Sequence, residues 1–398
     1  MLERTRFDSE IRHLLAAVAD PPAVREHEGP PPAPRRAPAP PRPAAPAWPP
    51  ARLRGLVLFR HWRSYTAAGG AVVMDVADLD PGFVAGPKAD ASCLKEWAKS
   101  AAPSASRARI AFVNLRGAGR KYTGLRDTTE TYFSSVTKLG VMYPAFQLRR
   151  DLAVLAERDR PADPAALFRA ARAQWAKDLS DAGFFRGNPS GALAWVRANG
   201  PKLEKIASMN ASREVAFLPD FHAAVKTTIV DSSNTGRNTC IQLLGATYMN
   251  SVRAQSGKVA GLKPLNWTAT AESLAALLTL IDREMLVSPV DSRAMRALMV
   301  EGATTGARTW ARYALHGSDD PTDAALRRGT DSVAGKIGFL YGGPEATWWD
   351  NLTQMADASI VRAPGGRSYI LVYSIPFHRK VIPTKVILPL IRSVHDCV

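Results

Sequence analysis

The stretch Thr-Tyr-Phe-Ser-Ser-Val-Thr-Lys, residues 131–138, leads into a run in which apolar residues recur at helical spacing up to residue 157. This spacing predicts a helix, and residues three apart lie on one face of a helix. Ser135 and Lys138 would therefore meet, and a lysine amine beside a serine hydroxyl can take its proton and make it a nucleophile. The pattern alone is weak, because Ser92-Cys93-Leu94-Lys95 also fits it and both could be ordinary helix surface.

Two more short patterns follow along the chain. In Ser232-Ser233-Asn234, a catalytic interpretation has Ser232 relaying a proton to a leaving nitrogen while Asn234 holds a substrate amide. Serine and asparagine are also typical of caps and turns, and Ser208-Met209-Asn210 fits the same pattern. On a predicted strand, Lys336-Ile337-Gly338 would supply a positive charge and a glycine against which a substrate can lie.

Taken in order, these segments resemble the class A β-lactamases and penicillin-binding proteins. The Ser135 segment looks like their nucleophile helix, and residues 231–238 resemble their Ser-Asp-Asn motif with the helix that follows it. Residues 334–338 are similar to their Lys-Thr-Gly strand, and residues 266–270 to their threonine-rich entry to a helix. The resemblance covers about residues 105–398 and favours Ser135 over Ser92 and Ser232 over Ser208.

The resemblance implies a role for each matching residue. Ser135 would be the nucleophile, Lys138 its base or proton relay, and Ser232 the partner of the leaving group, with Lys336 supplying electrostatic stabilisation. The N–H groups of Ser135 and Phe339 would form the oxyanion hole, and the expected substrate-binding residues are Asn234, Ile337, Gly338 and Phe339. The expected function is a serine hydrolase that forms an acyl-enzyme with a β-lactam or a related amide or ester. The alternative is a penicillin-binding peptidase, an acyltransferase, or a slowly acylating sensor without efficient deacylation. Neither a cofactor nor a metal is expected.

Three departures from that family bear on the function. Between residues 248 and 265, where the family carries its deacylating glutamate, this chain has no acidic residue, and Glu272 on the next helix has a different local context. Ile337 replaces the strand hydroxyl and Ser233 the middle aspartate. Ser135 and Ser232 also lie further apart in the chain than is usual in the family.

The expected fold class is α/β (α+β), with an antiparallel sheet built from both chain ends and a helical lobe inserted between them. Residues 1–50 are rich in proline, alanine and arginine and are expected to be disordered. A catalytic domain is expected over residues 51–398, with the sheet lobe at about 51–134 and 328–398 and the helical lobe at about 135–327. The expected strands lie at 55–59, 71–76 and 109–115 and again from residue 331, with a hairpin turn at 365–366. The expected helices include 164–182, 269–287 and 384–395.

The formal net charge of +16 raises the question of a polyanionic partner. No dense run of basic residues interleaved with aromatic ones occurs, so we expect no nucleic acid partner, with a polyanion-binding protein as the minor alternative. A monomer without a membrane span is expected, acting on a small-molecule or peptide amide. The three scattered cysteines suggest neither a disulfide framework nor a metal site. Because no signal peptide is visible, the predicted compartment is the cytoplasm; the alternative is a periplasmic or secreted protein whose N-terminus is misassigned.

Overall fold

The computed structural model describes residues 57–58, 74–75, 81–85, 88–101, 104–116, 120–181, 200–254, 256–304, 309–311, 332–341, 352–362, 366–377 and 384–398. The predictions for residues 1–50 lie outside the described residues. The chain forms two compact units. Unit 2 comprises residues 77–143, 229–232 and 253–398, and unit 1 comprises the remainder.

A six-stranded sheet forms the centre of unit 2, in the order β10-β11-β12-β4-β5-β3. Its strands are β3 (Phe83–Ala85), β4 (Arg109–Asn114), β5 (Arg120–Leu125), β10 (Ser332–Tyr341), β11 (Leu352–Arg362) and β12 (Ser368–Pro376). Neighbouring strands are antiparallel except β3 and β5, which are parallel. The expected mixed α/β fold, with one sheet assembled from both ends of the chain, is therefore confirmed.

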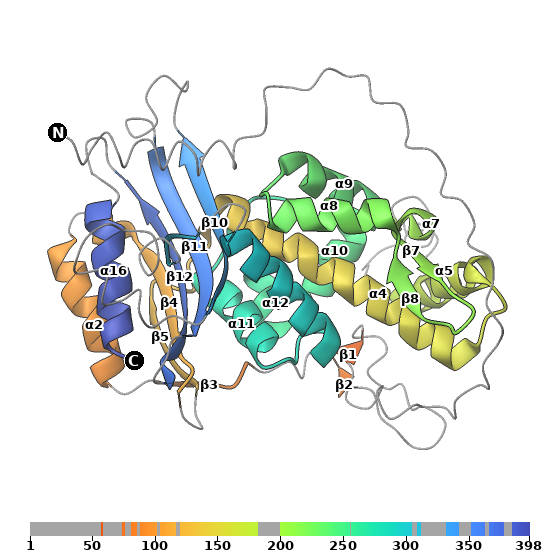
Figure 1. Ribbon diagram of the computed structural model, residues 1–398, viewed down its shortest axis with the longest axis horizontal. Helices are drawn as coiled ribbons and strands as arrows, with labels where there is room; N and C mark the ends of the chain where they lie inside the picture. The colour runs from red at the N-terminus through yellow and green to blue at the C-terminus, as the bar shows by residue number, and fades with distance from the viewer. Residues whose placement is uncertain are drawn as a thin grey trace. The chain divides into compact units, whose positions relative to one another are not determined.

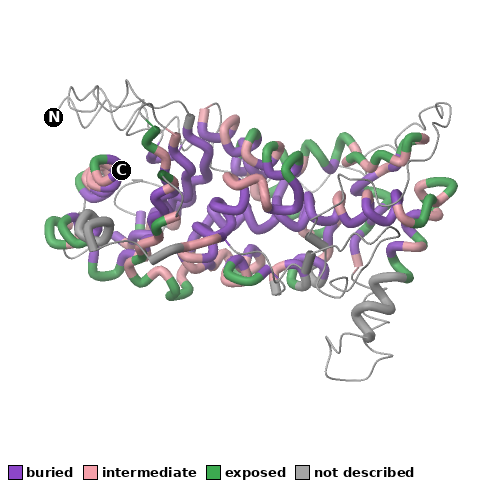
Figure 2. The backbone as a smooth tube through the Cα atoms, turned by 90° about the horizontal axis from the view of Figure 1, so that it is seen from below, coloured by how far each residue is buried: buried purple, intermediate pink, exposed green. Residues whose placement is uncertain are grey.

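Strand β12 is buried at all but its two end residues, so both faces of the sheet must be covered. Figure 2 shows the buried parts of the backbone in purple. One face packs against α11 (Ala271–Asp282) and α12 (Pro289–Thr304). On the other side lie α2 (Lys88–Ser100) and α16 (Thr384–Asp396), as Figure 1 shows. The short α3 (Ser104–Arg107) contacts β12. The helices α11 and α12, which we expected in the helical lobe, thus belong to the same unit as the sheet.

The β11–β12 hairpin follows the predicted pattern, in which two strands flank a glycine turn. The two strands pair from Gln354 with Pro376 to Arg362 with Ser368. Gly366 precedes β12 with a φ of +77°, in the left-handed region that favours glycine. The antiparallel register of the two strands therefore agrees with a hairpin about residues 365–366.

Unit 1 is mainly helical. Its described elements include α5 (Pro164–Asp181), α7 (Leu203–Ile206), α8 (Pro219–Ile229), α9 (Asn234–Leu244), α10 (Ala246–Ala254), the strands β7 (Ala207–Met209) and β8 (Val215–Phe217), and most of α4 (Leu139–Asp159). The ends of α4, α8 and α10 belong to unit 2. In the runs expected as strands at 55–59 and 71–76, the described residues form β1 (Val57–Leu58) and β2 (Met74–Asp75), which pair with each other in a separate parallel sheet. No helix among the described residues is long and apolar enough to span a membrane.

The C-terminal helix α16 is fixed to α2 by polar as well as apolar contacts. The Trp97 indole N–H donates a hydrogen bond of 2.8 Å to the Val386 carbonyl. Cys397, just after α16, is disulfide-bonded, whereas Cys240 is free and buried. The remaining cysteine of the chain, Cys93, belongs to α2, which packs against α16. The scattered cysteines suggest no disulfide framework, and the structure nevertheless has Cys397 in a disulfide bond.

Replacing Cys397 by Ser should lower the free energy of unfolding by about 2–4 kcal/mol, because a crosslink restricts the unfolded chain. Urea unfolding with and without a reducing agent measures this loss. Reduction should destabilise the native protein to the level of the variant and leave the variant unchanged. Equal stability of the native protein in both conditions would show that the disulfide adds nothing.

Candidate active site

Ser135 and Lys138 lie on the 3-10 helix η4 (Ser134–Lys138), which precedes α4. The sequence predicts a helix here, and its first turn is tighter than an α-helix. In a 3-10 helix, residues i and i+3 lie directly above one another, so the two side chains share a face. Both residues are buried: Ser135 is 8% exposed and Lys138 is fully buried.

The Lys138 side-chain nitrogen contacts Ser232, which is distant in sequence. Lys138 Nζ donates to the main-chain carbonyl of Ser232 and lies 3.4 Å from its Oγ. Ser232 has a φ of +59°, an unusual value for a residue other than glycine, and is 1% exposed. The first two predicted motifs are therefore in direct contact.

Strand β10 lies unusually close to η4 at Gly338. A Cβ atom on Gly338 would lie 2.7 Å from Phe133 O and 2.8 Å from Ser135 N, closer than such atoms approach. Glycine is therefore required at this position because backbone meets backbone. The third predicted motif thus reaches the main chain of the candidate nucleophile.

A hydrogen bond adds to this contact. The Ser134 hydroxyl donates to the carbonyl of Phe339, the residue after Gly338. Ser134 has a φ of +48°. A non-glycine residue held in that region costs free energy, which the surrounding contacts must offset. Sequence analysis did not identify Ser134, because its importance comes from a partner more than two hundred positions away.

Lys336 carries its amine into the interior. The residue is 1% exposed, and burial lowers the pKa of its ammonium to about 7, while the charges of Asp357 and Asp231 act in the opposite direction. Asp231 directly precedes Ser232, so the lysine is within electrostatic reach of the second motif. A lysine with this pKa changes its charge near neutral pH.

Asp357 on β11 is a second buried charge beside β10, and it pairs in register with Ile337. Burial raises the pKa of its carboxyl group to about 7, opposed by hydrogen bonds from Ser359 and from backbone N–H groups. One of its oxygens accepts from Trp310 N at 2.7 Å and from Ala311 N at 3.3 Å. Asp357 therefore fixes the segment after α12 to the sheet.

The other predicted residues are placed as follows. Ile337 and Phe339 lie on β10 and are 3% and 9% exposed. Asn234 is the first residue of α9, whose N-cap, Ser233, accepts a hydrogen bond of 3.0 Å from Gly236 N. The capping interpretation of this segment thus holds for Ser233. Asn234 belongs to unit 1, whereas Ser135, Lys138, Ser232 and Lys336 all belong to unit 2.

The competing motifs have ordinary surroundings. Lys95 of the Ser92 pattern is exposed on α2. Asn210 of the Ser208 pattern is exposed, and its side chain bonds both to the Glu214 side chain and to the Glu214 backbone N–H in the turn between β7 and β8. Ser135 and Ser232, in contrast, are both buried.

Trp267 is a neighbour of Lys138 that sequence analysis did not single out. The Lys138 Nζ atom lies 5.7 Å from the centroid of its ring. The described residues contain no group of three or more His, Cys, Asp or Glu side chains able to hold a metal ion. The chemistry that this arrangement supports is proton transfer between a serine hydroxyl and a buried amine.

Comparison with known proteins finds similarity in structure only. Neither a family model nor a curated protein matches the sequence. The structure is similar to the TLA-3 extended-spectrum β-lactamase, with 14% identity over 77% of this chain and 98% of that one and a TM-score of 0.46. It is also similar to PBP-A (13% identity, 77% and 95% covered, TM-score 0.44) and to a β-lactamase from Burkholderia phymatum (15%, 78% and 99%, 0.44). Similarity at this level does not establish an activity or a substrate, which have to be argued from the geometry of the site.

Replacing Gly338 by Ala should destabilise the fold by about 1–3 kcal/mol, because backbone must shift to admit the methyl group. Urea unfolding measures the loss, and backbone amide chemical shifts locate it at residues 133–138. Gly366→Ala is the control, since its Cβ would meet nothing within 4 Å and its cost comes from φ alone. Unchanged shifts at 133–138 in Gly338→Ala would contradict the close approach.

Proposed function

We propose that the chain is a serine acyl hydrolase or acyltransferase in which Ser135 attacks the carbonyl of a β-lactam or a related amide or ester. The observation that carries this proposal is the buried contact between Lys138 and Ser232, with Ser135 one 3-10 turn from the lysine. A surface helix motif would not bury both a lysine and its serine partner. Burial of a polar cluster of this kind is characteristic of functional sites.

The proposed acylation begins when the neutral Lys138 amine takes the proton of Ser135 Oγ. The oxygen forms a bond to the substrate carbonyl carbon, and the carbonyl electron pair moves onto its oxygen. As the tetrahedral intermediate collapses, the bond to the leaving nitrogen or oxygen breaks. The proton held by Lys138 passes through the Ser232 hydroxyl, which lies 3.4 Å away, to the leaving group.

The negative charge that develops on the carbonyl oxygen needs hydrogen-bond donors fixed in advance. We assign this task to the backbone N–H groups of Ser135 and Phe339. The close approach at Gly338 and the Ser134 bond to Phe339 O support the assignment, since they hold the two peptide segments together. Lys336 would add a positive charge, and Ile337 and Phe339 would contact the substrate.

Deacylation needs a base that activates water, and the described residues offer few candidates for it. The carboxylates near residues 248–265 have other partners: Glu272 pairs with Lys258 at 2.6 Å, and Glu130 pairs with Lys263. This supports the alternative within the proposal, a long-lived acyl-enzyme that an amine acceptor resolves or that serves as a sensor. The disulfide at Cys397 supports the periplasmic or secreted alternative over the cytoplasm, because such bonds persist in oxidising compartments.

The first prediction is covalent labelling of Ser135 by a penicillin or a cephalosporin, followed over time by intact-protein mass spectrometry. We expect an adduct that persists, and Ser135→Ala should abolish it. Ser134→Ala is the matched control, since it retains the nucleophile and should label more slowly. Labelling that survives in Ser135→Ala would refute the assignment of the nucleophile.

The second prediction concerns pH. If acylation requires the Lys336 charge, its rate should fall as pH rises through about 7, because the ammonium loses its proton there. Lys336→Arg should remove this fall, since a guanidinium stays charged. Asp357→Asn should move the fall to lower pH, because the Asp357 charge raises the pKa of Lys336. Stopped-flow acylation rates at constant ionic strength test both variants. A Lys336→Arg profile identical to that of the native protein would mean that another group titrates.

A further inference from the structure

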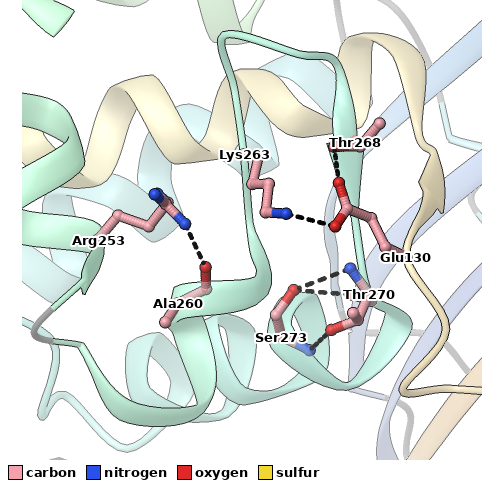
Figure 3. Close-up of polar contacts among 7 residues, drawn as sticks. All are labelled: Glu130, Arg253, Ala260, Lys263, Thr268, Thr270 and Ser273. Atoms are coloured by element: carbon pink, nitrogen blue, oxygen red, sulfur yellow. Dashed lines mark hydrogen bonds and ion pairs between the residues drawn. The ribbon is translucent and has the colours of Figure 1, made fainter.

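The loop of residues 256–270 is held by a network of polar contacts, shown in Figure 3. Arg253 Nη1 donates to Ala260 O at 3.0 Å, and the Lys263 and Thr268 backbones bond to each other. Glu130 accepts from Lys263 Nζ and, at 2.6 Å, from Thr268 Oγ1. The Thr270 hydroxyl then caps α11 in a capping box with Ser273. We call residues 256–270 the anchored loop.

The anchored loop is joined directly to the chain in front of Ser135. Its strand β9 (Thr268–Ala269) pairs with β6 (Thr131–Tyr132), and Phe133 N donates to Trp267 O at 2.9 Å. Trp267 has a φ of +59°, which few bulky residues adopt. The loop therefore fixes both the backbone and the direction of Trp267 relative to η4.

The anchored loop places the face of the Trp267 indole 5.7 Å from Nζ of Lys138, a fully buried residue. Removing an ammonium group from water is unfavourable, and an aromatic face offsets part of that cost because its π electrons attract cations. Indole has the strongest such effect among the aromatic side chains. This contact would stabilise the charged form of Lys138, which apolar packing alone would not do.

We propose that Trp267 is a positioning residue that stabilises the Lys138 ammonium formed when the amine takes the Ser135 proton. The proposal rests on the proposed acylation by Ser135 and adds to it the group that supports the base. The proton moves from Ser135 Oγ to Lys138 Nζ while the Oγ–carbon bond forms, so positive charge appears beside the indole during the step. Lys138 carries no positive charge before the proton transfers, so the indole stabilises the transition state more than the starting state. The activation barrier of acylation is therefore lowered.

The decisive experiment replaces Trp267 site-specifically by progressively fluorinated tryptophans, which keep nearly the same shape and weaken the attraction of the ring for cations. Acylation rate constants with a penicillin are measured by quenched-flow mass spectrometry. The rate should fall stepwise with fluorination, and Trp267→Leu should lose about 2- to 30-fold. Trp267→Phe should retain more activity than Trp267→Leu at equal stability.

Trp97 provides the matched control. It is buried on α2, where its N–H bonds to Val386 O, and fluorinating it should leave the acylation rate unchanged. A rate that is constant across the Trp267 series, or that falls equally in the Trp97 series, would overturn the role of Trp267 while acylation by Ser135 stands. If the native protein is not labelled at Ser135, the proposed function fails and this inference fails with it.

Discussion

The contact of two backbones, at Gly338 on β10 and at Ser135 on η4, sets the geometry of the candidate site. Because residue 338 has no side chain, the edge strand lies against the turn that carries the serine. The Ser134 hydroxyl then bonds to Phe339 O, and Ser134 holds a positive φ to do so. Rigid elements of this kind can hold two N–H groups at fixed separation, which a flexible loop could not do without losing conformational entropy at each turnover.

Burial of charge is the second constraint. Lys138 and Lys336 are both nearly inaccessible to water, although isolated ammonium groups are costly to bury. Each has a compensating neighbour: Lys138 has the Ser232 oxygens and the Trp267 ring, and Lys336 has the charges of Asp357 and Asp231. Neither arrangement is needed for a stable core, since apolar residues would fill the same space at less cost. The proposed acylation would account for this cost, because it needs Lys138 to gain and lose a proton and Lys336 to stay charged.

The sequence predicts much of this fold because its signals are local. Helical spacing after residue 138, the hairpin around Gly366 and the strand around Lys336 each depend on neighbours in the chain, and all three are present. The apolar run at 71–76 is less informative, because the strand with which it pairs depends on distant residues; its described residues form β2, which pairs with β1. Trp267, Ser134 and the Cys397 disulfide were missed for the same reason. Each acquires its role from residues far away in the sequence, which no spacing rule describes.

The same reasoning bears on deacylation. A loop with no acidic residue could still hold a catalytic water if a carboxylate from elsewhere reached it. Glu130 and Glu272 are the acidic residues beside the anchored loop that its lysines bind, through Lys263 and Lys258. Hydrogen bonds from the Lys263 and Thr268 side chains lower the pKa of Glu130, so its carboxylate stays ionised and is held by these two partners. A carboxylate so engaged is a weak base, because accepting a proton would break the bonds that stabilise its charge. The lysines of the anchored loop thus bind Glu130 and Glu272, the two carboxylates that could otherwise activate water. The same loop that holds Trp267 beside Lys138 would then both support acylation and slow the release of the acyl group.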